Sequence, residues 1–200
     1  MKATTFFLLI SMSWIFFNSC NQSGRQRSEA SSSDSVAGSV TTNSEDNPSA
    51  MDLHEKLMIS FSEDWMERES DPNLYPDYYG GSFIDNNGTF VITVTGNREQ
   101  HIKQLIDILG TDNFNVESVK YSYKQMMQEM DRIDAFLIDT TIPENHPVMT
   151  HFAGAYPDVM ENSVKVILTV VNKEITDAFR NDISNSPLVV FEQGELPGLF

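Results

Sequence analysis

The feature that most constrains the fold is a pattern that occurs twice between residues 51 and 200. The first copy spans residues 79–99 and the second spans residues 152–174. In each copy, a short motif ending in Asp leads into alternating apolar residues, and an Asn then precedes a basic and an acidic residue. Alternation predicts strands, and Asn is a favoured helix N-cap. The offset between copies grows from 73 residues (Tyr79 to Phe152) to 75 (Asn97 to Asn172), which predicts two extra residues in the second hairpin turn.

This pattern predicts an α+β fold, in which an N-terminal helix precedes two β-β-α-β repeats joined by a further helix. The first helix is expected over 52–69, with Asp52 as its cap and a core-facing apolar stripe that includes Trp65 and Met66. Asn87-Gly88 predicts a type I′ turn in the first hairpin. The predicted domains are 51–138, containing the first repeat and the connecting helix, and 139–200, containing the second repeat and a tail.

The N-terminal residues predict export and lipidation. Residues 1–19 form a signal peptide in this interpretation, with Lys2 ahead of an apolar run. The run ends in Phe-Asn-Ser-Cys, which resembles the bacterial lipobox, so we expect cleavage before Cys20 and lipidation of that cysteine by acyl chains such as palmitate. The expected location is the cell envelope, with the chain lipid-anchored to a bacterial membrane, the outer membrane being favoured.

Residues 20–50 continue as a Ser-rich segment whose composition predicts a disordered linker. The formal net charge is −16. Nucleic-acid binding needs clustered Lys and Arg, so this charge argues against a nucleic-acid partner and against docking on anionic lipid by charge alone. We therefore expect a membrane contact only through the lipid anchor.

Three motifs between residues 76 and 194 resemble the pro-regions of bacterial chymotrypsin-like serine proteases of the alpha-lytic and streptogrisin type. They are Gly81-x-Phe83-x-Asp85, the run 119–123 (VKYSY), and the run 183–191 (ISNSPLVVF). The resemblance implies a prodomain-like fold. It also implies a body that assists the folding of a protease and then inhibits it, with a C-terminal tail lying in the active site.

We expect no protease domain in the same chain. The role that the resemblance implies is therefore one in trans, on a protease encoded separately. The chain would then be an inhibitor or folding assistant of a separate, secreted chymotrypsin-like serine protease. The broader prediction is a non-enzymatic, membrane-anchored lipoprotein that binds an envelope or secreted protein. The candidate partner-binding residues are three tyrosines before the first hairpin and the end of the tail: Tyr75, Tyr78, Tyr79, Leu199 and Phe200. The alternatives are that the tyrosines pack on the first helix and that the tail is frayed.

We predict no catalytic residues, no cofactor and no metal. Cys20 is the only cysteine, and the sequence has no Gly-x-Ser-x-Gly motif. His101 is expected on the exposed side of its helix. The alternative to this prediction is a zinc site formed by His146, His151 and Glu144. A hydrolase with a histidine or carboxylate site is the alternative of a different functional class.

Overall fold

The computed structural model describes residues 48–196, all of which belong to one compact unit. Cys20, the predicted signal peptide, most of the linker, Leu199 and Phe200 lie outside the described residues. In chain order the elements are α1 (Ala50–Phe61), α2 (Trp65–Ser70), the 3₁₀ helix η1 (Pro72–Leu74), β1 (Tyr79–Ile84), β2 (Phe90–Val94), α3 (Arg98–Leu109), β3 (Asn115–Ser118), α4 (Tyr123–Leu137), α5 (Pro147–His151), β4 (Phe152–Asp158), β5 (Ser163–Leu168), α6 (Lys173–Asp182) and β6 (Val189–Gln193).

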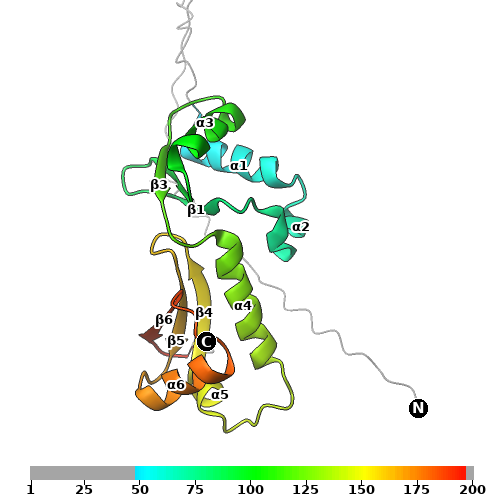
Figure 1. Cartoon of the computed structure of the whole chain (residues 1–200), viewed down its shortest axis with the longest axis vertical. Helices are drawn as coiled ribbons and strands as arrows, with labels where there is room; N and C mark the ends of the chain where they lie inside the picture. Colours follow the sequence, from blue (N-terminus) through cyan, green and yellow to red (C-terminus); the bar gives the residue numbers. More distant parts are fainter. Residues whose placement is uncertain (1–47, 197–200) are drawn as a thin grey trace, which may run out of the picture. The chain divides into compact units, whose positions relative to one another are not determined.

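The first half contains a three-stranded sheet in the order β1-β2-β3. β1 pairs antiparallel with β2, and β3 pairs parallel with it after the crossover through α3. Figure 1 shows α1 and α3 next to each other beside this sheet, where they contact one another and the strands. Leu53, Leu57 and Leu105 from the helices meet Phe90 and Ile92 from β2 in a fully buried core.

The second half repeats the same path. Its sheet has the order β4-β5-β6, with an antiparallel pair followed by a parallel pair. Val164, Val166 and Leu168 alternate along β5 and face a separate core, which includes Ile175 and Phe179 from α6. The predicted α+β class and its two β-β-α-β repeats are therefore confirmed.

The predicted helix over 52–69 is wrong in one respect, because it is broken into α1 and α2. Ser49 rather than Asp52 is the N-cap of α1. The Asp52 carboxylate accepts from the Ser49 backbone N–H, which completes a capping box. A new helix starts at Trp65, where the Asp64 carboxylate accepts from two backbone N–H groups. The break takes Trp65 and Met66 out of the predicted core stripe, and their exposed fractions are 65% and 64%.

The predicted type I′ turn is also wrong. Gly88 has a positive φ of 80°, but Asn87 does not, so only one turn residue is left-handed. The Asp85 carboxylate accepts from the N–H groups of Asn87 and Thr89, and the Gly88 N–H donates to the Asp85 carbonyl. This is the longer hairpin loop in which Gly occupies the left-handed position.

The predicted two-residue insertion is divided between two places. Ile84 pairs with Phe90 in the first hairpin, whereas Pro157 pairs with Val164 in the second. The second turn is therefore longer by one residue, and the other extra residue lies between β5 and the Asn172 cap of α6.

Helix α4 contributes its buried face to the second core through Met126, Ile133 and Phe136. It also contacts β1 and η1 of the first half, and its grouping with the first repeat in a 51–138 domain stays a prediction. The Pro-containing stretch after α4 predicts a loop, but its last residues begin the short helix α5. The His146 side chain accepts from the Val148 N–H and caps α5.

The β4–β5 turn of the second half hydrogen-bonds to the segment between β3 and α4. Asn162, at a φ of 50°, accepts from the N–H groups of Lys120 and Tyr121 and donates to the Tyr121 carbonyl. In the same turn, Val159 lies against Gly81 of β1. A Cβ on Gly81 would be 2.6 Å from Val159 Cγ1, and its φ of 127° also favours glycine.

Candidate protein-binding surface

The three tyrosines predicted to bind a partner do not form an exposed patch. Tyr75 and Tyr79 are only 5% and 3% exposed, and their rings stack with centroids 5.7 Å apart. Phe61 packs on both rings, and Tyr123 of α4 contacts them from the other half of the chain. The alternative that they pack on the first helix therefore describes these two residues, because burying such large rings is more favourable than exposing them.

Tyr78 and His101 form a separate contact. Their rings stack with centroids 4.3 Å apart, and both side chains are half-buried. The expectation that His101 is solvent-exposed is therefore wrong, and Tyr78 is left as only a partly accessible contact residue. The predicted tail residues, Leu199 and Phe200, lie outside the described part of the chain.

A cavity of about 240 Å³ lies beside the tyrosine cluster. Ser82 Oγ is 2.8 Å from the Tyr79 hydroxyl and 3.2 Å from His54 Nδ1. Burial raises the pKa of Tyr79 well above its usual range and, with help from nearby Tyr75 and Glu69, raises the pKa of Tyr123 to about 12. Burial, followed by the charge of Arg68, lowers the pKa of His54.

This Ser–His contact lacks the third member of a serine triad. Within residues 48–196, no carboxylate is hydrogen-bonded to His54 to orient it as a general base. The two histidines of the zinc alternative also bond to separate partners. His146 Nε2 is 3.2 Å from Asp182, whereas His151 bonds to Thr169, and no group of three or more potential ligands converges in the described part of the chain.

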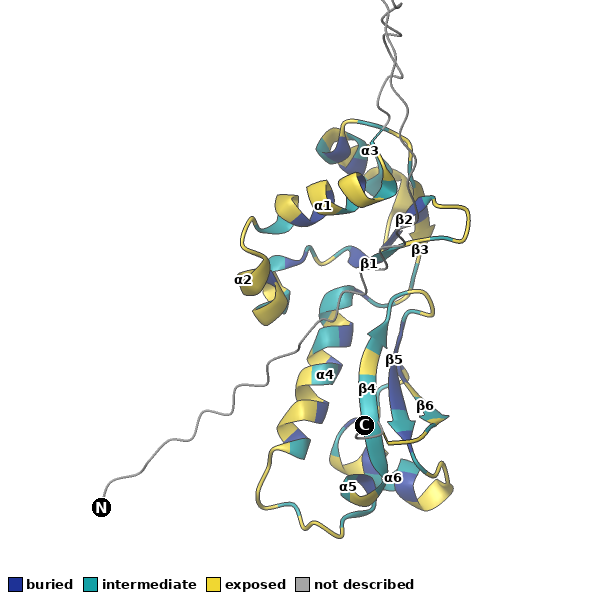
Figure 2. Ribbon diagram, turned by 180° about the vertical axis from the view of Figure 1, so that it is seen from behind, coloured by how far each residue is buried: buried dark blue, intermediate teal, exposed yellow. Residues whose placement is uncertain are grey.

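The second sheet presents a different kind of surface. Residues paired across neighbouring strands point to the same face, and Lys165 of β5 pairs with Tyr156 of β4 and Val190 of β6. Tyr156 and Val190 are 46% and 38% exposed, on the side opposite the core. In Figure 2 the central strand β5 is mostly dark blue, and the edge strand β4 is teal and yellow. We call this side the outer face of the second sheet; its members are Gly154, Tyr156, Lys165, Ile167, Val190 and Glu192.

A charged group lies in the middle of the outer face. Lys165 is 4% exposed, and its ammonium group donates to the carboxylates of Glu161 and Glu192, the latter at 2.7 Å. These two hydrogen bonds hold the pKa of Lys165 above its ordinary value. Tyr156 and Val190 therefore flank a lysine whose charge is paired rather than free, in a group of one ammonium and two carboxylates.

The corresponding part of the first sheet is covered. Thr93 of β2 pairs with Gly81, and its hydroxyl donates to the Gly81 carbonyl at 3.1 Å, with Val159 packed against Gly81. Gly154 occupies the place of Gly81 in the second sheet and pairs with Ile167, yet a Cβ there would meet nothing within 4 Å. At Gly154 and Tyr156 the outer face of the second sheet is thus open, where the first sheet is closed at Gly81.

The sequence analysis did not predict this face, although one residue of the sequence points to it. Lys165 interrupts an otherwise apolar strand, Val164 to Leu168, at a position on the opposite side from the core. That signal marks an unusual position, but it does not name Tyr156 and Val190 as its neighbours, because neighbours follow from strand register.

The described helices include none that is long and apolar enough to cross a membrane. Comparison with protein families gives two adjacent matches. Residues 39–119 match a Pro-like N-terminal domain, and residues 124–194 match a Pro-like C-terminal domain. The body is protease pro-region-like. The resemblance of its motifs to protease pro-regions is consistent with both matches, and the join between them falls just before α4. A search of curated proteins gave no significant match.

Proposed function

We propose that this protein is a non-enzymatic binding protein whose pro-region-like body contacts another protein through the outer face of the second sheet. The observation that carries the proposal is the difference between the two sheets. The β4–β5 turn covers Gly81 in the first sheet, whereas Tyr156 and Val190 stay exposed in the second. Tyrosine is enriched at protein interfaces, and the exposed Val190 adds apolar area beside it.

We further propose that the body is held at a bacterial membrane through lipidation of Cys20. The support is the lipobox-like ending of the apolar N-terminal run. Several acyl chains on one residue anchor a protein firmly, because each buried CH₂ contributes roughly 0.8 kcal/mol. In cells fed a labelled fatty acid, the wild-type chain should carry label and sediment with membranes. Cys20→Ala should lose both properties, and a labelled, sedimenting variant would contradict the anchor.

A second, narrower candidate is inhibition or assisted folding of a secreted chymotrypsin-like serine protease in trans. The Pro-like matches over both halves favour this candidate over other partners. The tail after β6, with Leu199 and Phe200 at its end, would then approach the active site. Strand β6, which contributes Val190 to the outer face of the second sheet, leads into this tail. The outer face and the tail would then contact the same protease.

The test is a titration of the purified full chain against secreted chymotrypsin-like proteases of the source bacterium. We expect the chain to slow the protease's hydrolysis of a chromogenic peptide. We also expect it to speed the recovery of protease activity when the denatured protease is refolded in its presence. The double variant Tyr156→Ala and Val190→Ala should weaken both effects at least tenfold. Its matched control is Ile138→Ala, which shortens another exposed apolar residue at the end of α4.

The outcomes separate the two levels of the proposal. Unchanged protease activity at excess wild-type chain would contradict the role in trans. Equal potency of the double variant and wild type would contradict the outer face as the contact. Circular dichroism should show both variants folded, since all three side chains are exposed and surface changes usually alter stability by less than about 0.5 kcal/mol.

A further inference from the structure

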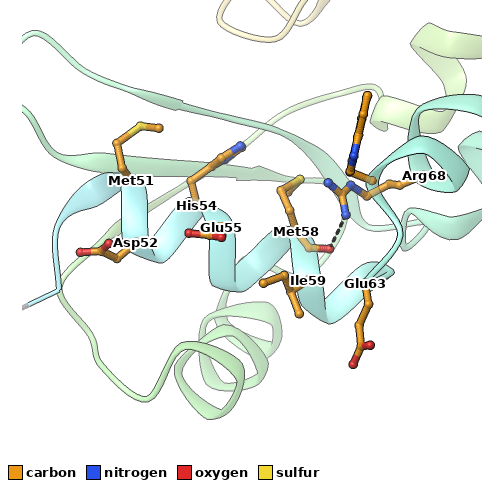
Figure 3. A pocket seen from close by; sticks show the side chains of 9 residues that line it. Met51, Asp52, His54, Glu55, Met58, Ile59, Glu63 and Arg68 are labelled. Atoms are coloured by element: carbon orange, nitrogen blue, oxygen red, sulfur yellow. Dashed lines mark hydrogen bonds between the residues drawn. The ribbon is translucent and has the colours of Figure 1, made fainter.

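We infer that a groove between α1 and α2 binds a second protein segment, one that is basic and carries an apolar side chain at its centre. This inference rests on the proposed binding role, and it concerns a surface in the first half rather than the outer face of the second sheet. The groove encloses about 460 Å³ and is lined by residues of α1, the link after it and α2 (Figure 3).

A buried arginine fixes the shape of the groove. Arg68 of α2 donates from Nη1 to the carbonyls of Met58, at 3.1 Å, and Ser62, at 2.6 Å (Figure 3 shows the bond to Met58). Because Met58 lies in the last turn of α1 and Ser62 is its C-cap, the arginine ties the second helix to the end of the first. The groove is therefore a built feature of the helix break rather than a gap between mobile side chains.

Part of the groove lining is apolar and exposed to solvent. Met51, Ile59 and Trp65 line it and are all exposed, and Met66 lies exposed beside Trp65. Tryptophan is enriched among the residues that dominate binding energy, and methionine adapts to different apolar partners. Leaving such side chains in water has a free-energy cost of about 25 cal/mol per Å², which a docked apolar side chain would remove.

The rim of the groove is acidic. Asp52, Glu55 and Glu63 line it, and all three carboxylates are exposed. Between residues 50 and 70 there are six acidic residues and two basic ones. Lys56 and Arg68 hydrogen-bond to backbone carbonyls and keep their positive charges, so two of the six negative charges are offset. The formal charge of residues 50–70 is therefore negative, at −4 from six negative and two positive charges.

This charge selects the occupant. Lysine or arginine side chains of a partner can reach the carboxylate rim while an apolar side chain enters between Met51, Ile59 and Trp65. An acidic segment or an anionic membrane surface would be repelled by the same rim. We therefore assign the groove to a basic, amphipathic segment of a partner protein.

The experiment uses the full chain with Trp14→Phe, so that Trp65 is its only tryptophan. The probe is a synthetic amphipathic peptide of about 15 residues with leucines on one face and lysines beside them. Its control has glutamate at every lysine position. We expect the basic peptide to shift Trp65 emission to the blue and to bind at least tenfold more tightly than the acidic one. Binding should weaken severalfold between about 0.05 M and about 0.5 M salt, because the rim is exposed to solvent.

The variant that tests the rim is Glu55→Gln with Glu63→Gln, which should lower affinity for the basic peptide about tenfold. The matched control is Glu99→Gln with Asp107→Asn, which removes two exposed carboxylates from α3, outside the groove. Asp52 is left intact because it completes the capping box of α1.

Equal binding of both peptides, absence of binding, or a rim variant that behaves like wild type would each overturn the inference. A blue shift that depends on protein concentration without peptide would also overturn it, because the occupant would be a second copy of the chain. None of these outcomes touches the protease titration with the Tyr156 and Val190 variant, so the two proposals can fail separately.

Discussion

The two halves of this protein follow the same path, but they differ in what covers the outer side of each sheet. In the first half, the β4–β5 turn places Val159 against Gly81, and Thr93 is nearly inaccessible. In the second half, Gly154 faces open space, and Tyr156 is exposed. Of the two copies of the β-β-α-β unit, one therefore has its outer sheet face covered within the protein, while the other keeps an exposed face to which a partner can bind.

The largest expected effect comes from the two separate cores. Phe90 in the first and Phe179 in the second are both buried almost completely. Phe90→Ala and Phe179→Ala should each reduce the free energy of unfolding by about 3–5 kcal/mol, because each leaves a cavity. Urea unfolding followed by circular dichroism measures the loss. A loss below about 1 kcal/mol for either variant would contradict the two-core description of the halves.

The next effect tests the covered and open faces directly. Gly81→Ala should destabilise the protein by about 1–3 kcal/mol, since the new methyl group would meet Val159 and the φ of 127° strains any residue except glycine. Gly154→Ala, at the equivalent place in the second sheet, should change stability by less than about 0.5 kcal/mol. Equal losses for the two variants, measured in the same urea titration, would remove the contrast between the faces.

A smaller effect is expected from alkaline pH, and it arises where the first half meets α4. The pKa of Tyr123 is raised from 10.0 to about 12, because the neutral phenol is favoured in its buried surroundings. The folded state therefore holds this proton more tightly than the unfolded state does. The resulting stability is complete below pH 10 and is lost as pH rises from 10 toward 12.

At pH 11 the loss from Tyr123 should be about 1 kcal/mol, following the usual 1.36 kcal/mol per pH unit. Absorbance of tyrosinate against pH, combined with urea titrations at pH 9 and pH 11, measures it. Tyr123→Phe should reduce the pH dependence, while Tyr156→Phe, at an exposed tyrosine of the second sheet, serves as the matched control. An identical pH dependence in both variants would contradict the buried position of Tyr123.

The parts of the fold that sequence predicted well are those fixed by local chemistry. Asn97 and Asn172 cap α3 and α6, Ser122 forms a capping box with Gln125, and Gly110 ends α3 in the left-handed conformation. Each of these signals acts within a few residues of the helix end, so it is readable without knowledge of the fold.

The parts that sequence reasoning missed depend on contacts between distant residues. Helical periodicity runs through Trp65, but Arg68 ties α2 back to α1 and leaves Trp65 outside the core. Tyr75 and Tyr79 are buried because Tyr123 of α4 packs on them across a separation of more than forty residues. The outer face of the second sheet depends on strand register, which the alternation of apolar residues does not specify by itself.

The most direct test of the central claim is photo-crosslinking from the outer face of the second sheet. A benzophenone amino acid would replace Tyr156 in the full chain, expressed in the source bacterium, with Ile138 as the control position. We predict an irradiation-dependent adduct from position 156, identified by mass spectrometry as a chymotrypsin-like serine protease or another envelope protein, and none from position 138. The same adducts from both positions, or no adduct from position 156, would contradict it.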